Sequence, residues 1–305
     1  MFSFILSSFS SINFMNKQIL CFGEVLWDAF GEVKKAGGAP MNVARHMVQQ
    51  GNDVLFASSV GIDPSGVELT VFLKENGLYS ALLQRDENLP TCEVTVQLDE
   101  ANTATYIIPK PVSWDDIKFT DELDAASKTV GAVVFGSLAC RDEATLNTLL
   151  TILDEGDALK IFDVNLRPPH FTMSTIETLA ARANVIKMNE EEAELLIHGG
   201  SGDLREMITE FQKKFHTRII CVTRGDKGAI IWNDYEFYEH PGFKVEVADT
   251  VGAGDSFLAT FITGLLNDTP MDQILQKACA VGAYVASQRG ANPVYKVDEV
   301  LAQFS

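Results

Sequence analysis

The chain has 305 residues, of which 46% are hydrophobic and 22% are charged, so it can bury a sizeable core and is not disordered throughout. Its formal net charge is −18 and it has no run rich in Lys and Arg, which argues against nucleic acid and anionic membrane surfaces as partners. Beyond the first 14 residues, no window is long and apolar enough to suggest a membrane span.

The first 14 residues, MFSFILSSFSSINF, are apolar and rich in serine. A signal peptide is one interpretation, but the first cation is Lys17 and no small-x-small cleavage site follows. We favour a disordered leader over residues 1–16, with a folded domain occupying residues 17–305.

The five cysteines, at positions 21, 92, 140, 221 and 279, are odd in number and form no Cys-x-x-Cys pair. At least three lie in apolar runs, which is typical of reduced core residues in a cytosolic protein. The spacing disfavours a structural zinc site. We therefore expect a cytoplasmic location.

The first elements alternate between strand and helix periodicity. Strands are expected at 18–22 and 53–60, and helices at 41–50 and 67–76, each helix ending at a glycine, Gly51 or Gly77. Two short alternating segments, 92–98 and 103–108, then follow with only the turn-like residues 99–102 between them, which predicts a β-hairpin. Residues 27–36 and the hairpin region at about 92–109 together predict a small lid.

The alternation resumes after the hairpin. Strands are expected at 132–135, 160–164, 185–188, 219–223, 229–232 and 245–248. Helices are expected at 143–153, 190–198, 204–215, 255–266 and 271–287. Strands alternating with helices indicate an α/β fold with a mostly parallel sheet covered on both faces, here as one domain with a β lid.

The strongest chemical signal is the run Asp-Thr-Val-Gly-Ala-Gly-Asp-Ser-Phe at 249–257. The small residues Gly252, Ala253 and Gly254 let backbone amides face a ligand, and the following helix presents its positive end, which suits an anion. Asp255 would repel that anion, unless it receives a proton from an attacking hydroxyl. A tight turn with an ordinary helix-start aspartate is the alternative interpretation.

Three further runs are ambiguous when each is taken alone. Gly-Gly-Ala-Pro-Met-Asn-Val-Ala at 37–44 is either a helix start or a site in which Asn42 binds a hydroxylated ligand. Asn-Glu-Glu-Glu at 189–192 is either an acidic first helical turn or a group that holds the water shell of Mg²⁺. Thr-Arg-Gly-Asp-Lys-Gly-Ala at 223–229 is either a β-turn or a nucleotide-binding loop.

Two common glycine-rich motifs are missing from the sequence. The pattern Gly-x-x-x-x-Gly-Lys-Ser/Thr does not occur, and Gly252 and Gly254 lack the third glycine of the dinucleotide fingerprint. These gaps disfavour a P-loop enzyme and a nicotinamide-dependent dehydrogenase.

In this order the runs resemble those of the ribokinase-like sugar kinases, the pfkB family, and among them the fructokinases. Residues 37–44 with Val-Gly-Ile-Asp-Pro-Ser-Gly at 60–66 are similar to the family's N-terminal signature, and residues 249–257 to its C-terminal signature. The resemblance extends from about residue 17 to 304 and implies a doubly wound α/β sheet with a β lid over the sugar.

The resemblance implies an ATP-dependent kinase that acts on a small unphosphorylated sugar, most readily fructose. It assigns Asp255 as the catalytic base and the amides of Gly252, Ala253 and Gly254 as the anion hole. Positions that match sugar contacts are Asp28, Gly38 and Asn42. Positions that match the ATP site are Asn189, Thr223, Gly225 and Gly228.

The resemblance also implies two cations. Glu192 matches the residue that organises Mg²⁺ through water. Potassium would lie beside Asp249, with backbone carbonyls near Val251, Val285 and Gly290.

Three positions bear on the substrate. Kinases of sugar phosphates in this family tend to have Lys after the paired glycines, where this chain has Ala39 and Pro40. Arg167 fits a fructokinase, but it would also bind a sugar acid such as 2-keto-3-deoxygluconate, and nucleosides remain open as well. Cys279 stands where some relatives have a polar residue near adenine.

Two expectations concern partners and rivals. Relatives often dimerise through the lid, and the apolar edge at 106–108 would allow a homodimer here. The rival from another class is a sugar-binding protein that kept the fold and lost catalysis, which the intact Asp255 and Gly-Ala-Gly run disfavour.

Overall fold

The computed structural model describes residues 17–30, 33–98, 104–197, 202–234 and 236–304. The expected leader at 1–16 and the expected turn at 99–102 lie outside these residues. Within the described ranges no helix is long and apolar enough to cross a bilayer.

Nine strands form the main sheet, in the order β13-β12-β11-β10-β9-β8-β1-β4-β5. All neighbours from β11 to β5 are parallel, whereas β12 and β13 are added in antiparallel fashion at one edge. The strands are β1 (Ile19–Phe22), β4 (Val54–Gly61), β5 (Leu83–Asp86), β8 (Ala132–Gly136), β9 (Leu159–Asp163), β10 (Val185–Asn189), β11 (Ile219–Thr223), β12 (Ala229–Asn233) and β13 (Glu236–His240).

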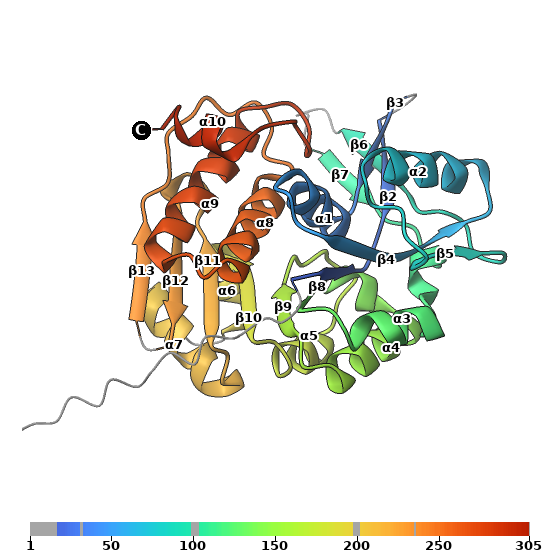
Figure 1. Cartoon of the computed structure of the whole chain (residues 1–305), viewed down its shortest axis with the longest axis horizontal. Coiled ribbons are helices and arrows are strands. Elements are labelled where there is room, and N and C mark those ends of the chain that lie inside the picture. Colours follow the sequence, from blue (N-terminus) through green and yellow to red (C-terminus); the bar gives the residue numbers. More distant parts are fainter. Residues whose placement is uncertain (1–16, 31–32, 99–103, 198–201, 235, 305) are drawn as a thin grey trace, which may run out of the picture.

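Helices cover both faces of the main sheet (Figure 1). One face carries α3 (Asp121–Ser127), α4 (Glu143–Glu155), α5 (Met173–Ala180), α6 (Glu190–Leu196) and α7 (Leu204–Phe215). The other carries α1 (Ala39–Gln49), α2 (Pro64–Glu75), α8 (Ala253–Leu266) and α9 (Met271–Ala286), and the short α10 (Val297–Leu301) packs on α9. The expected parallel sheet with helices on both faces is confirmed.

Successive side chains of a strand point to opposite faces of the sheet, so each central strand contributes to the hydrophobic core on both faces. Leu20 and Phe22 of β1 enter the cluster under α4 and α5, whereas Ile19 and Cys21 enter the cluster under α1 and α8. Because both faces are covered, the central strands are almost continuously apolar. All five cysteines are buried and unpaired, as the sequence predicts.

A second, four-stranded sheet stands beside the first, in the order β3-β2-β6-β7. It is formed by β2 (Leu26–Phe30), β3 (Val33–Gly37), β6 (Glu93–Leu98) and β7 (Ala104–Ile107). The pair β6 and β7 is antiparallel, and β2 pairs with β6, so the expected hairpin and its partner segment are both present. Figure 1 shows this sheet beside α1 and α2.

One predicted strand is wrong. Residues 245–248 form no strand, because the amides of Ala248 and Asp249 both donate to the carbonyl of Ala286 at the end of α9. The segment therefore lies along a helix end instead of joining the sheet. Helix α8 also begins at Ala253, two residues before the predicted start.

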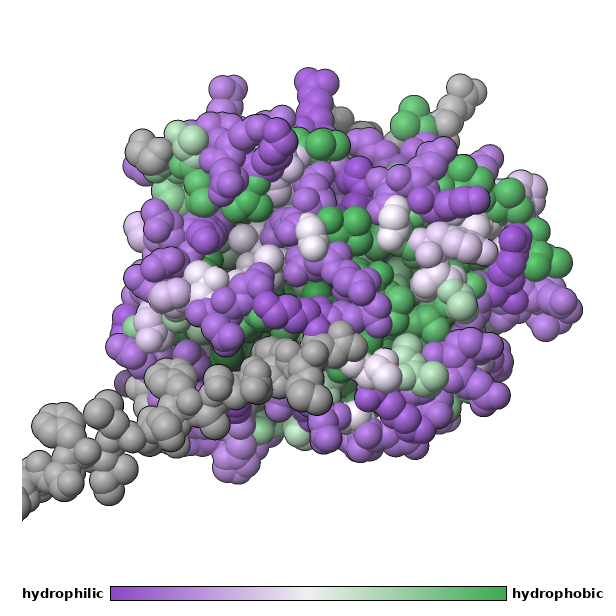
Figure 2. All heavy atoms as spheres, in the orientation of Figure 1, coloured by the Kyte–Doolittle hydropathy of each residue, from purple (hydrophilic) through white to green (hydrophobic). Residues whose placement is uncertain are grey.

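Hydrophilic side chains cover most of the face seen in Figure 2. This agrees with the strongly acidic composition of the chain.

Candidate active site

A cavity of about 590 Å³ opens between the two sheets, at the carboxyl ends of the parallel strands. The chain continues from β1 to β4 on one side and places β8 on the other, so the strand order reverses between β1 and β8, the usual position of ligand sites in such sheets. The polar or charged side chains of the cavity wall are Glu24, Asp28, Asn42, Asn165, Arg167, Lys187, Asn189, Thr223, Thr250 and Asp255.

The turn before α1 brings its first residues against the exit of β1. Gly38 has φ of +109°, and a Cβ there would stand 2.5 Å from the carbonyl oxygen of Glu24. Only glycine fits such a close backbone approach at this φ. The turn thereby places Asn42, in the first turn of α1, on the cavity wall.

Asp255 lies deep in the protein in the first turn of α8, although water reaches it through the cavity. Asn42 Nδ2 donates to its Oδ2 at 2.8 Å. Burial raises the pKa of Asp255 to about 6, and the charge of Asp163 also raises it, whereas Lys187, the Asn42 hydrogen bond and Arg167 lower it. The carboxylate is therefore ionised at neutral pH yet basic enough to accept a proton.

Asp28, on β2, faces the same cavity from the smaller sheet. Burial raises the pKa of Asp28 to about 6, against the opposing charges of Arg167 and Lys35. The structure thus brings together Asp28, Gly38, Asn42, Arg167 and Asp255, the residues predicted for the sugar side and the base.

The Gly-Ala-Gly loop is built as an N-cap for α8. Gly252 has φ of +82° and a Cβ there would stand 2.2 Å from the carbonyl oxygen of Ala291. Gly252 and Gly254 line the cavity. The loop therefore presents the amino end of a 14-residue helix to the cavity, as expected for an anion site.

Asp249 connects that loop to the segment after α9. Its Oδ1 accepts the Val251 amide and its Oδ2 accepts the Gly290 amide, both at 3.1 Å. Val285 lies in α9, and its carbonyl accepts the Gln288 amide at 2.9 Å. Asp249, Val251 and Gly290, which the resemblance implies lie around one cation, are thus joined to one another.

The nucleotide-side predictions divide into two groups. Asn189 and Thr223 line the cavity, but Gly225 and Gly228 are not part of its wall. Gly228, at φ of +78°, is explained by backbone packing, because a Cβ there would stand 2.0 Å from the carbonyl oxygen of His240.

Glu192 is buried and not part of the cavity wall. Its Oε2 accepts the Asn189 amide at 2.9 Å and its Oε1 accepts the Leu166 amide at 2.7 Å. The carboxylate thereby fixes Asn189 and the loop that leads to Arg167. Each oxygen keeps a second lone pair for a water ligand.

The sequence did not single out the ion pair between Lys187 and Asp163, whose Nζ and Oδ1 are 2.9 Å apart in the interior. Burial opposes the charge of Lys187, but the carboxylates of Asp163, Glu192 and Asp255 raise its pKa above the ordinary value. A Cβ on Gly254 would stand 3.2 Å from Lys187 Nζ, so the ammonium lies beside the glycine loop. One feature of the sequence could have pointed to Lys187: it stands two residues before Asn189 on β10. Residues two apart in a strand lie on the same face of the sheet.

His46 was also missed. Its Nε2 is 3.0 Å from the Ala291 carbonyl, which can only accept, so Nε2 carries the hydrogen and Nδ1 accepts from the Tyr295 hydroxyl at 3.0 Å. Burial lowers the pKa of His46 to about 4, so the ring stays neutral. The histidine anchors residue 291 against Gly252, and Asn292 Nδ2 donates to Asn42 Oδ1 at 2.6 Å.

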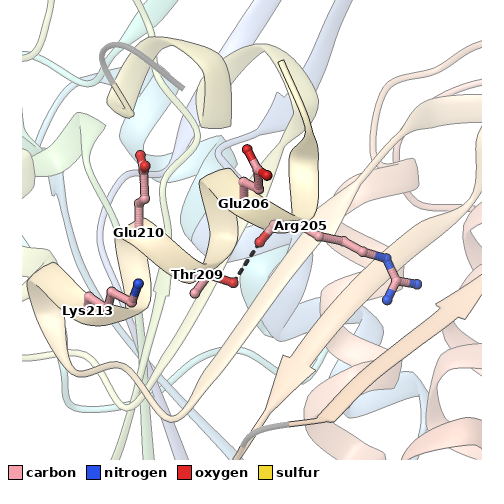
Figure 3. Close-up of a pocket in the computed structure, with 5 residues that line it drawn as sticks. All are labelled: Arg205, Glu206, Thr209, Glu210 and Lys213. Atoms are coloured by element: carbon pink, nitrogen blue, oxygen red, sulfur yellow. Dashed lines mark hydrogen bonds between the residues drawn. The ribbon is translucent and has the colours of Figure 1, made fainter. Parts of the chain in front are cut away.

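A second hollow lies along α7 (Figure 3). Its side chains come from one helix and do not converge on a common point, and Thr209 Oγ1 simply donates to the Arg205 carbonyl at 2.7 Å. It lacks the opposed polar groups that define the large cavity. The lining residues are Arg205, Glu206, Thr209, Glu210 and Lys213.

Comparison with known proteins identifies the family. Residues 10–297 match the pfkB family of carbohydrate kinases. The chain belongs to this family. It is accordingly a sugar kinase, a phosphotransferase with an alcohol group as acceptor.

Individual relatives agree with that assignment. Fructokinase-2 of Solanum lycopersicum is 27% identical, with 90% of this chain and 92% of the relative covered. Probable fructokinase-5 of Arabidopsis thaliana is 29% identical, with 90% and 93% covered. The structure of fructokinase with bound ATP from Xylella fastidiosa superimposes with a TM-score of 0.83 at 25% identity, covering 95% of this chain and 99% of that one.

Cys279, for which the resemblance implies a position near adenine, lies in α9 and is buried in the hydrophobic core. Burial raises the pKa of its thiol to about 12, so it is neither a nucleophile nor a ligand in this state.

Proposed function

We propose that this kinase transfers the γ-phosphate of ATP to a hydroxyl of a small unphosphorylated sugar, with fructose as the first candidate. The observation that carries the proposal is the position of Asp255, between the sugar-side residue Asn42 and the amides of the Gly252–Gly254 loop. The relatives named fructokinase, and the neighbour with bound ATP, support it.

In the proposed mechanism the sugar hydroxyl lies against the Asp255 carboxylate. Asp255 orients the hydroxyl and accepts its proton as the new O–P bond forms and the bond to ADP breaks. The amides of Gly252, Ala253 and Gly254 stabilise charge on the transferred group. Because such transition states are loose, position and charge stabilisation contribute more than early deprotonation.

The charges of the cavity favour a neutral sugar. Glu24, Asp28 and Asp255 contribute three carboxyl groups, and Arg167 lies close enough to lower the pKa of each. A phosphorylated sugar would be repelled by these groups and would find no Lys at Ala39 or Pro40. Arg167 keeps a sugar acid as the second candidate.

On the nucleotide side we propose Asn189 and Thr223 as ATP contacts, with Gly225 and Gly228 in the loop behind them. Within the described part of the chain no three His, Cys, Asp or Glu side chains form a ready metal cluster. We propose that Mg²⁺ binds the nucleotide phosphates and is held by Glu192 through water. Mg²⁺ neutralises phosphate charge when bound.

Potassium would be held beside Asp249 with carbonyls near Val251, Val285 and Gly290. The hydrogen bonds that Asp249 accepts from the amides of Val251 and Gly290 support a shared site at this point. We also propose that the four-stranded sheet closes over the sugar as a lid. A homodimer through the lid edge is proposed too, because Ile107 exposes 47% of its surface there. The five buried free thiols are compatible with a cytoplasmic location.

A panel assay tests the proposed function. ADP release is measured with fructose, other neutral hexoses, 2-keto-3-deoxygluconate and nucleosides, each with and without potassium. We expect turnover with fructose that exceeds the rate without sugar by at least ~10²-fold, since lid closure and positioning suppress hydrolysis. Binding of sugar without ADP release would instead support the non-catalytic alternative.

The rate should also depend on pH. Asp255 and Asp28 must be ionised, and burial raises the pKa of each to about 6, so protonation below that pH removes the base and a sugar contact. We expect kcat/KM for the sugar to fall by about tenfold or more between pH 7 and pH 5. A flat profile between pH 5 and 7.5 would contradict the role of Asp255, and Asp28→Asn should make the slope shallower.

A further inference from the structure

Glu24 is the third carboxyl group of the cavity, and neither the motifs nor the proposed proton transfer uses it. It directly follows Gly23 at the end of β1, exposes 1% of its surface and lines the cavity with Asp28 and Asp255. The chain holds it tightly, because Gly38 packs on its backbone carbonyl and a Cβ on Gly23 would stand 2.8 Å from Pro40. Its position is therefore fixed by β1 and the start of α1.

One oxygen of this carboxyl group has no partner. Glu24 Oε2 is buried and makes no hydrogen bond with any described residue. In contrast, Asp255 Oδ2 in the same cavity accepts from Asn42. A buried acceptor without a donor is destabilising, so the fold leaves a position that a ligand donor would fill.

The surroundings indicate what kind of donor fits. Burial raises the pKa of Glu24 to about 7 and the charge of Asp255 adds to this, while the backbone amides of Glu24 and Ala39 and the charge of Arg167 lower it. An anionic phosphate would be repelled by these carboxylates. A neutral hydroxyl can donate to Oε2.

We propose that Glu24 binds a hydroxyl of the sugar through Oε2 and makes the site select sugars that carry a hydroxyl at that position. The inference rests on the proposed function. An analogue without that hydroxyl would leave Oε2 buried and unpaired, and sites built in this way reject the deoxy analogue strongly.

The test is a thermodynamic cycle in which the Glu24 side chain and single hydroxyls of the substrate are removed separately and together. Glu24→Ala is expected to raise KM for fructose by about tenfold or more, with kcat changed less than about threefold and KM for ATP unchanged. The single-deoxy fructoses are then compared as competitive inhibitors of both proteins. One of them should bind the wild-type protein weakly and lose no further affinity in Glu24→Ala, while the others lose the same factor as fructose.

Two variants keep the result interpretable. Ser58→Ala removes another buried, unpartnered oxygen outside the cavity wall, in β4, and should leave KM for the sugar unchanged. If Glu24→Ala fails to fold, Glu24→Met, which has a similar length but only a weak acceptor, replaces it in the same series, with the same hydroxyl expected to stand out.

The outcomes separate the two levels of inference. An active wild-type enzyme whose KM is indifferent to Glu24, or an affinity loss that is equal for every analogue, would overturn the role of Glu24 and leave the proposed function standing. A wild-type protein that releases no ADP with any sugar would overturn the proposed function, and the Glu24 contact with it.

Discussion

Asp255→Asn is expected to lower turnover at saturating sugar and ATP by at least ~10²-fold, the low end of general-base contributions. Asparagine has nearly the same shape, and its carbonyl oxygen can still accept the 2.8 Å hydrogen bond from Asn42. What is lost is a group that can take a proton, so the effect should fall on kcat rather than on binding.

Titration calorimetry and steady-state ADP release check this together. Dissociation constants for sugar and ATP should remain within about threefold of the wild-type values, because only the reacting step loses stabilisation. Asp272→Asn, on the exposed first turn of α9, is the matched surface control and should leave turnover unchanged. Near-normal turnover in Asp255→Asn would refute the assignment of the base.

The parts of the site that the sequence predicted are those with local requirements. Gly38 and Gly252 both sit at positive φ where the chain turns into a helix, a local requirement, although the backbone that each packs against, at Glu24 and Ala291, is distant in sequence. The strand-helix alternation likewise follows from local periodicity, and the carboxyl ends of the parallel strands then collect at one edge. The alternation alone did not bring Asp255, Asn42 and Asn189 together; the resemblance to the pfkB family did.

The contributions of Glu24, His46 and the Lys187–Asp163 pair could not be predicted in this way. Each depends on a partner from a distant part of the chain: Ala291 for His46 and Asp163 for Lys187, across two neighbouring strands. The unpaired oxygen of Glu24 is visible only once its surroundings are known. A polar residue next to a strand does not show, from the sequence alone, whether a hydrogen-bond or ion-pair partner will lie beside it in the fold.

Secondary structure was missed or wrong mainly where tertiary contacts override weak patterns. The edge strands β5 and β13 carry charged or polar residues at alternate or adjacent positions, and the short helices α3, α5 and α10 have too few turns to show a clear period. At 245–248 the periodicity is strand-like, but the end of α9 supplies the hydrogen-bond acceptor. A strand-like pattern in the sequence therefore does not show which part of the chain the segment will hydrogen-bond to.

A buried ion pair supports the base of the four-stranded sheet. Arg141 and Asp115 are bidentate, with Nε–Oδ1 at 2.6 Å and Nη2–Oδ2 at 2.8 Å, and both side chains are only 2% exposed. The guanidinium also donates to the carbonyl of Pro109, just after β7, and lies 4.1 Å from the ring centroid of Trp114. One cation therefore joins the 3₁₀ turns η1 (Ser113–Asp116) and η2 (Leu138–Arg141) to the end of the hairpin.

Removing that cation should have the largest effect on stability. Arg141→Met is expected to lower the free energy of unfolding by about 3–5 kcal/mol, because it leaves the Asp115 carboxylate buried without its partner. Urea denaturation measures the loss. Adding Asp115→Asn should recover about 1 kcal/mol or more of the free energy of unfolding, since the uncompensated charge is then absent and the two changes are not additive.

The control is Arg218→Met, which breaks the half-exposed pair with Asp234 and should cost no more than about 1 kcal/mol. If Arg141→Met costs no more than Arg218→Met, the ion pair does not hold the hairpin to the main sheet.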